Sequence, residues 1–351
     1  MQMRNTRFGV VLPSGAGKLN EVGIAWSVRR SVKSPVFSIA VILILGGCGG
    51  AGTVAASLGG ERLEVASLGV EPRYFGSDGT SFEDLQGQTV RALVSGAEYR
   101  PDSLSRAEGL VGLITFKDDG SGDIVFNHPN TSPWALSATD EPGVYERISS
   151  RTPGSDQFAT LTRVNDVFIL RVYTEYTPSR INYGLTYAAF GFETPIPVRP
   201  TGFVSYTGAG IIQISDNQSG TFLLSGTSML DVDFAGGAVS GTLLHVNDPE
   251  IDLDGDGQFD DRLVMTLTLE DGAVDLYGID GQVGASGEAY IGISPDPEVL
   301  DVTVTASGAE GAFYGPSAGS LGVVYDGNMT MALPDSSPVD YTFGGLTVVH
   351  Q

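Results

Sequence analysis

The sequence has very few of the residues that build covalent or metal-linked sites. Its 351 residues include one cysteine, Cys48, and three histidines that lie far apart. A single cysteine excludes an internal disulfide, and so few scattered histidines do not form a convincing zinc site. Neither a disulfide framework nor a zinc site is therefore expected to define the function of the protein.

Positive charge is also scarce, above all in the second half of the chain. Beyond Arg199 the only basic residue is Arg262, whereas the chain as a whole has 42 acidic and 19 basic residues and a formal net charge of −23. Repulsion from phosphate groups argues against nucleic acid or an anionic lipid surface as a partner. A cation or a basic protein patch would be attracted, although the charge surplus has a simpler interpretation as a device for solubility.

Long hydrophobic runs are absent as well. The most apolar stretch, PVFSIAVILIL at residues 35–45, has eleven residues, which is too short for a membrane-spanning helix and typical of a signal-peptide core. It ends in LGGC, which resembles a bacterial lipobox, so we predict a lipoprotein signal peptide over residues 1–47 and lipidation of Cys48. Residues 48–70 follow as a glycine-rich flexible tether, and the lipid chains would anchor the protein to a membrane.

The remaining chain indicates an all-β protein. Residues 71–200 contain β-branched and aromatic runs such as LVGLITF and VFILRVYTEY between turn clusters, and predict a smaller β-rich region. Three prolines at residues 195–200 mark a boundary. Beyond it, Leu263, Met265, Leu267 and Leu269 share one face of a half-buried strand.

Short strands of this kind recur over residues 201–351. They predict a C-terminal antiparallel β-barrel of about eight strands, since closure removes exposed strand edges. The glycine pairs Gly236–Gly237 and Gly344–Gly345 are expected at bends or bulges of the barrel wall.

Two segments of the C-terminal region resemble a known family. GTSMLDVDFAGGAVSGTLLHV is similar to the strand, turn and strand of transferrin-binding-protein-like β-barrel domains, and GAFYGPSAGSLGVVYDG is similar to the segment that closes their barrel. Val323 and Tyr325 stand where the family has glycine and phenylalanine. The matching positions are Gly311, Phe313, Tyr314, Gly315, Pro316, Ala318, Leu321 and Gly322.

The resemblance implies a function as well as a fold. Proteins of this family are surface lipoproteins of Gram-negative bacteria that capture host iron proteins, and relatives bind complement regulators or haem carriers. We therefore expect a lipid-anchored monomer at the cell surface of the outer membrane that captures a protein or a nutrient of the iron or haem type. A structural envelope lipoprotein without a small ligand is the alternative.

A third hypothesis is an exported serine esterase. GPSAG matches the G-x-S-x-G pattern of a nucleophile elbow around Ser317, and Asp326, Asp340 and His350 follow in the chain order of an α/β-hydrolase. The residues after the motif predict a strand and not the required helix, however, and His350 follows too soon after the serine. We therefore expect no enzyme activity.

The sequence DLDGDGQFDD resembles a calcium-binding loop. Asp252, Asp254 and Asp256 occupy the first, third and fifth positions, and Gly257 allows the sharp turn. Leu263 stands at the twelfth position in place of the bidentate glutamate of an EF-hand, and an empty acidic hairpin tip is the alternative to a Ca²⁺ site. The complete predicted ligand set is Asp252, Asp254, Asp256, Gln258, Asp260 and Asp261.

Overall fold

The computed structural model describes most of the chain from Leu85 onward. The described residues are 85–100, 103–127, 134–140, 143–147, 155–176, 183–216, 221–251, 260–276, 278–292, 296–333 and 337–351. The predicted signal peptide, Cys48 and the tether lie outside them. Within these ranges, no helix combines the length and the hydrophobicity that crossing a membrane requires.

The first eight strands form a closed barrel of their own. Consecutive strands pair in antiparallel fashion, and β1 pairs with β8 to complete the circle. The strands are β1 (Thr89–Arg100), β2 (Ser103–Phe116), β3 (Ile124–Asn127), β4 (Trp134–Ala138), β5 (Val144–Arg147), β6 (Ser155–Val164), β7 (Val167–Tyr176) and β8 (Tyr183–Gly191). The predicted β-rich region is confirmed, and its closure into a barrel is a new finding.

The last eight strands form a second closed antiparallel barrel, as the sequence predicts. It is closed by β9 and β16, which pair from Thr207 opposite His350 to Asp216 opposite Tyr341. The strands are β9 (Phe203–Asp216), β10 (Thr221–Asp233), β11 (Ala238–Ile251), β12 (Asp261–Val274), β13 (Ile279–Tyr290), β14 (Glu298–Tyr314), β15 (Ser320–Ala332) and β16 (Val339–His350).

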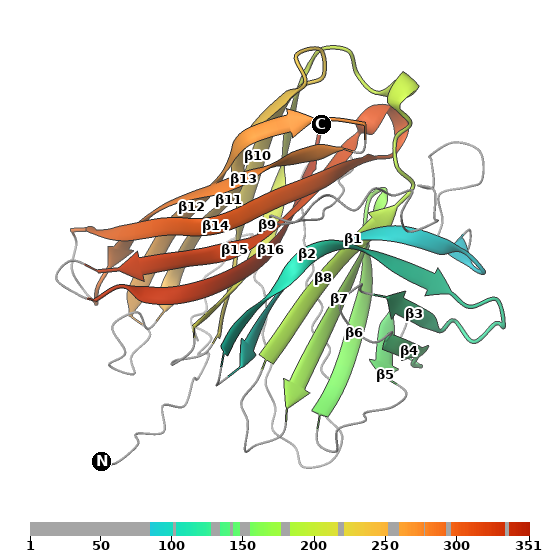
Figure 1. Cartoon of the computed structure of the whole chain (residues 1–351), viewed down its shortest axis with the longest axis horizontal. Coiled ribbons are helices and arrows are strands. Elements are labelled where there is room, and N and C mark those ends of the chain that lie inside the picture. Colours follow the sequence, from blue (N-terminus) through green and yellow to red (C-terminus); the bar gives the residue numbers. More distant parts are fainter. Residues whose placement is uncertain are drawn as a thin grey trace, which may run out of the picture.

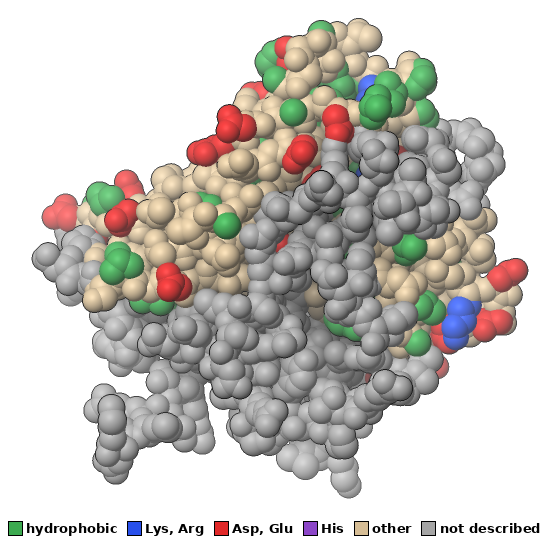
Figure 2. All heavy atoms as spheres, viewed as in Figure 1, with side chains coloured by type: hydrophobic (Ala, Val, Ile, Leu, Met, Phe, Trp, Pro, Cys, Tyr) green, Lys and Arg blue, Asp and Glu red, His purple; other side chains and the backbone are tan. Residues whose placement is uncertain are grey.

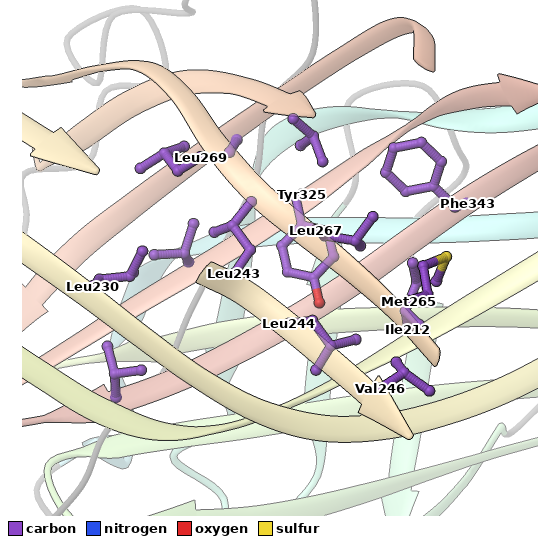
Figure 3. Packing of buried hydrophobic residues seen from close by; sticks show 14 of the residues in the cluster. Ile212, Leu230, Leu243, Leu244, Val246, Met265, Leu267, Leu269, Tyr325 and Phe343 are labelled. Carbon is purple, nitrogen blue, oxygen red and sulfur yellow. The ribbon is translucent and has the colours of Figure 1, made fainter. Parts of the chain in front are cut away.

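The interior of the second barrel is a filled apolar core. In β12 the alternating residues Leu263, Met265, Leu267 and Leu269 are all buried, and Tyr325 of β15 reaches the same interior. Figure 3 shows side chains from opposite walls meeting in this core. The predicted period of two is confirmed, and the interior is packed with side chains instead of forming a water-filled lumen.

One of the glycine pairs has a different role from the one expected. β16 pairs with both of its neighbours through Gly344 and Gly345 without a shift in register, so there is no bulge at this point. A Cβ atom on Gly345 would lie 2.4 Å from Cε2 of Tyr325. The glycine therefore makes room for this ring. The other pair does lie in a turn, where Gly237 has a φ of 70°.

The two barrels lie against each other. Figure 1 shows β15 and β16 next to β1 and β2, the first strands of the N-terminal barrel. A separate hydrophobic cluster joins the outer faces of the two walls. Its buried members are Leu93, Val167, Ile169, Tyr187 and Ala189 from the first barrel and Ala312, Tyr314, Val324, Leu346 and Val348 from the second.

Candidate functional site

The GPSAG segment forms a tight turn between two strands. β14 ends at Tyr314, a short 3₁₀ helix spans Pro316–Ala318, and β15 begins at Ser320. Ser317 is exposed, with φ 54° and ψ 31°, and its carbonyl oxygen accepts a hydrogen bond of 3.2 Å from Nε2 of Gln351. A nucleophile elbow requires a helix after the serine. The strand that follows here confirms the predicted strand-turn-strand context.

The other residues of the hypothetical esterase triad do not converge on Ser317. His350 lies opposite Ser320, whereas Asp326 lies opposite Gly344, six residues further along β15. At about 3.3 Å per residue, Asp326 is about 20 Å from Ser320. Asp340 lies opposite Thr330, still further along the barrel. The geometry therefore does not bring either of these two aspartates to Ser317 and His350.

Phe313 closes one end of the C-terminal barrel. Its ring centroid lies 4.9 Å from that of Phe234 and 6.3 Å from that of Tyr206, and the guanidinium of Arg199 lies over the ring at 5.1 Å. Phe234 belongs to the β10–β11 turn of the other family-like segment. The two segments that carry the resemblance therefore meet at the same end of the barrel.

Tyr314, the next residue, points to the opposite side and helps to join the barrels. Glu193, which follows β8, forms an isolated β-bridge with Tyr314. The neighbouring Thr194 donates its backbone N–H to the carbonyl oxygen of Phe313 and its hydroxyl to that of Gly315, both at 2.7 Å. Residues 192–194, which follow the last strand of the first barrel, thus pair with the end of β14 in the second barrel.

Gly315 is required at the point where the turn touches the first barrel. Its φ is 73°, a left-handed value that favours glycine. A Cβ atom at this position would lie 2.2 Å from Oδ2 of Asp166, which lies in the β6–β7 turn. The motif glycine therefore serves both the turn and the contact between the barrels.

A buried charged cluster lies in the same joint. Nε of Arg91 is 3.0 Å from Oε1 of Glu193, and both residues are 5% exposed. Glu310 and Tyr314, each 1% exposed, lie near this pair and act on it electrostatically. One guanidinium therefore faces two carboxyl groups between the barrels.

The electrostatics of this cluster follow from burial and charge. Burial by itself lowers the pKa of Arg91, but the adjacent Glu193 and Glu310 outweigh it and raise the pKa above its ordinary value. Burial raises the pKa of Glu193, and Arg91 opposes that shift. Burial likewise raises the pKa of Tyr314. The joint therefore holds one buried positive charge, on Arg91, next to a carboxyl group whose ionisation is opposed by burial and favoured by that charge.

Most of the predicted calcium loop lies outside the described residues, including Asp252, Asp254, Asp256 and Gln258. Asp260 is exposed, whereas Asp261 is 2% exposed and its Oδ1 accepts a hydrogen bond of 2.7 Å from the backbone N–H of Gly292. Asp261 therefore ties the start of β12 to the end of β13. Within the described part of the chain, no group of three or more histidine, cysteine or acidic side chains is arranged to hold a metal ion.

Sequence reasoning did not identify the residues of the joint. Arg91 lies within TVRALVSG, and Glu193 directly follows the apolar run YAAFGF. A charged residue beside or within a strand that is otherwise apolar is a signal of a buried ion pair, because such a charge rarely remains without a partner. The sequence does not reveal that the two residues meet.

Comparisons with known proteins give matches in structure but not in sequence. No protein-family model matches the chain, and no curated protein matches it. Similar solved structures include transferrin binding protein B of Haemophilus parasuis, at 15% identity over 74% of this chain and 45% of that protein, with a TM-score of 0.36. The corresponding protein of Neisseria meningitidis is 12% identical over 74% of this chain and 44% of its own, with a TM-score of 0.32.

A protein of unknown function from Nostoc punctiforme is also similar, at 11% identity over 73% of this chain and 94% of its own, with a TM-score of 0.22. This chain spans less than half the length of the transferrin binding proteins B that it matches. It resembles them in its β-barrel fold, which is the resemblance that the C-terminal motifs predict.

Proposed function

We propose that this chain is a lipid-anchored binding protein of the cell envelope whose barrels present a protein ligand-binding surface. The observation that carries this proposal is that the described apolar side chains of each barrel pack into a buried interior cluster. Barrels that bind small molecules keep a cavity inside the wall. A ligand of this chain would therefore be held on the outer walls and loops, which suits a macromolecule.

The turn at Ser317 supports binding in preference to hydrolysis. The segment around the motif that resembles a nucleophile elbow uses Phe313 to close the barrel end and Gly315 to contact the first barrel. Phe313, which precedes the motif, and Gly315 within it thus have structural roles in the scaffold. Asp326 and Asp340, the acids of the hypothetical triad, pair along the barrel wall away from the turn that holds Ser317.

The anchor and the location are part of the proposal. The LGGC sequence supports lipidation of Cys48, and the tether would then hold the barrels away from the membrane. The C-terminal motifs resemble those of outer-membrane lipoproteins that capture host iron proteins. An iron- or haem-carrying protein is therefore the first ligand class to test, with a monomeric chain at the cell surface.

Three experiments test this proposal. Cells grown with an alkyne fatty acid should label the full chain but not a Cys48→Ser variant, with Ser57→Ala as the matched control. Added protease should degrade the protein on intact cells. Purified residues 49–351 should retain iron-loaded transferrin or haemoglobin on a sensor surface. Protection from protease on intact cells, together with no retention of either protein, would instead support the structural envelope lipoprotein.

We also propose that residues 252–261 bind Ca²⁺. The support is the spacing of Asp252, Asp254, Asp256 and Asp260 around two glycines. A bound ion would offset the repulsion among these carboxylates at the β11–β12 connection. Asp261, whose Oδ1 accepts the hydrogen bond from Gly292, would complete the ligand set.

A further inference from the structure

Large hydrophobic side chains are exposed at one end of the C-terminal barrel. Phe203 is 73% exposed, Leu276 64%, Val198 54% and Ile196 47%. Phe203 begins β9, Leu276 lies in the β12–β13 turn, and Ile196–Val198 is a 3₁₀ helix in the connection between the barrels. We name these four residues the apex patch.

The chain topology brings the four residues to the same end. In an antiparallel barrel the start of β9 and the β12–β13 turn face the same way, as does the turn at Ser317. This is the upper end of the molecule in Figure 1, where Figure 2 shows hydrophobic side chains on the surface. Arg199 links the two halves of the patch, because its Nη2 donates a hydrogen bond of 3.2 Å to the carbonyl oxygen of Leu276.

Hydrogen bonds within the chain preorganise the apex patch in the absence of a partner. Arg199 Nη1 donates to the carbonyl oxygen of Asp275 at 2.8 Å, and the same guanidinium lies over Phe313 in the barrel core. Within the 3₁₀ helix, the backbone N–H of Val198 donates to the carbonyl oxygen of Pro195 at 3.0 Å. Binding to such a surface costs little ordering of the chain, which favours its use as a recognition site.

The charge around the apex patch identifies the kind of partner that fits. Residues 201–351 carry 22 of the 42 acidic residues and only one of the 19 basic residues, so nearly all of the net charge belongs to the C-terminal barrel. Near the patch, Glu270 and Asp271 are exposed at the end of β12. Arg199 is a cation beside the patch, and its guanidinium is engaged by the carbonyl oxygens of Asp275 and Leu276. An apolar surface of this kind within a largely acidic surround complements a protein surface with an apolar protrusion and a basic rim.

The same charge argues against two other occupants. A second copy of this chain would bring together two strongly acidic barrels, and an anionic lipid surface would repel the barrel. Exposed apolar patches that are held in one conformation mark interaction sites in soluble proteins. The remaining candidate is a basic protein.

We infer that the apex patch is a docking surface for a basic protein that inserts apolar side chains between Ile196, Val198, Phe203 and Leu276. This inference rests on the proposed binding function and assigns to it a surface and a partner class. It places recognition at the end of the barrel that holds the connection to the first barrel. The predicted calcium loop lies at the other end, between β11 and β12.

Photo-crosslinking in intact cells tests the inference with the full chain. A benzophenone amino acid replaces Val198 in one variant and Val299, which is 72% exposed elsewhere on the same barrel, in the control. After illumination in the presence of growth medium or host serum, we expect a discrete adduct at position 198 and none at position 299. The captured protein should have an isoelectric point above about 9, and no adduct should form when illumination takes place in about 1 M salt, which screens the attraction between the two proteins.

A second pair of variants shows whether the apolar contact is required. Phe203→Ser combined with Leu276→Ser should reduce the adduct at position 198 about tenfold or more, as truncation of central interface residues does. Met229→Ser, at a residue that is 52% exposed on the outer wall, should leave it unchanged. All of these residues are exposed, and equal melting temperatures would show that the variants fold.

Several outcomes would overturn the inference. An adduct with a second copy of this chain or with lipid, an adduct only at position 299, or a signal that the Phe203→Ser and Leu276→Ser changes do not reduce would each reject the apex patch as the docking surface. These results leave the proposed binding function intact if a protein is still retained by residues 49–351. If no protein is retained and no adduct forms at either position, both proposals fail.

Discussion

Arg91 and Glu193 form a buried ion pair, with Nε 3.0 Å from Oε1, at the place where the first strand of one barrel meets the segment that leads into the other. Around it, Ser95 donates its hydroxyl to the carbonyl oxygen of Tyr325 at 3.0 Å, and Thr194 donates to that of Gly315. Hydrogen bonds and an apolar cluster thus connect the two closed barrels directly. The two barrels are therefore expected to unfold as one cooperative unit.

Replacement of Arg91 should be strongly destabilising. Arg91→Ala leaves the carboxyl groups of Glu193 and Glu310 buried without the positive charge between them, and breaking a buried pair in this way costs about 3–5 kcal/mol. Urea denaturation of residues 49–351 measures the loss. The control is Lys117→Ala, which removes a surface ion pair of 2.7 Å with Asp123 and should change the stability little. Equal effects of the two changes would contradict the buried role of Arg91.

The stability should depend on pH through His350. Burial lowers the pKa of this imidazole below 6.5, and its Nδ1 has no hydrogen-bond partner among the described residues. Between the folded pKa and 6.5 the unfolded chain binds more protons, so the contribution of His350 to stability is present above about pH 6.5 and is lost as the pH falls. His350→Gln should reduce the slope of stability against pH below 6.5. The same slope in both proteins would rule out this origin.

A methyl group at Gly345 should destabilise the C-terminal barrel. In Gly345→Ala the new Cβ would lie 2.4 Å from the ring of Tyr325, so the ring or the strand must move. Overpacking of this kind costs about 1–3 kcal/mol. Gly202→Ala is a matched control, because a Cβ atom there meets no atom within 4 Å. Thermal melting should fall for the first variant only, and an unchanged melting temperature would show that Tyr325 adapts freely.

Calcium should stabilise the folded chain. Adding millimolar Ca²⁺ to chelated protein should raise the melting temperature, because an ion that binds only the folded state at 100 times its dissociation constant adds about 2.7 kcal/mol. Asp254→Asn with Asp256→Asn should abolish the shift, whereas Asp340→Asn, at an exposed residue of β16, should preserve it. A melting temperature that does not respond to Ca²⁺ in the unmodified chain would indicate an empty acidic loop.

Ser317 should have no catalytic role. Purified residues 49–351 and the Ser317→Ala variant should hydrolyse p-nitrophenyl acetate equally slowly, because Asp326 and Asp340 lie along the barrel wall away from the turn and cannot complete a triad with Ser317 and His350. The left-handed φ of 54° makes Ser317→Gly the stabilising counterpart, since glycine adopts this conformation without strain. Hydrolysis that the alanine substitution abolished would require a different arrangement of the turn.

Local features of the C-terminal barrel could be predicted from the sequence because local patterns determine them. The alternation from Leu263 to Leu269 follows the two-residue period of a strand, and the turn after Tyr314 follows from Gly315 and Pro316. The closure of the first barrel could not be predicted. β3 and β5 have four residues each, which is too short for a clear periodic signal.

The joint between the barrels was beyond prediction for a different reason. Arg91 and Glu193 are 102 residues apart, and Ser95 and Tyr325 are 230 apart. The sequence around these residues contains no local pattern that would predict either contact. The apex patch is equally hidden, because hydrophobic residues in a sequence of this kind are expected in the core and only the fold shows which of them reach solvent.

Phe313 and Tyr314 give β14 an unusual sensitivity to register. Because neighbouring side chains of a strand point to opposite faces, one dipeptide contributes to two separate hydrophobic cores. An insertion of a single residue in β14 before Phe313 would move Phe313 to the position of Tyr314, placing a phenyl ring beside Arg91 and Glu193, and would move Tyr314 to the position of Gly315, where a side chain meets Asp166. The alignment of one strand thus determines whether both barrels and their junction can form together.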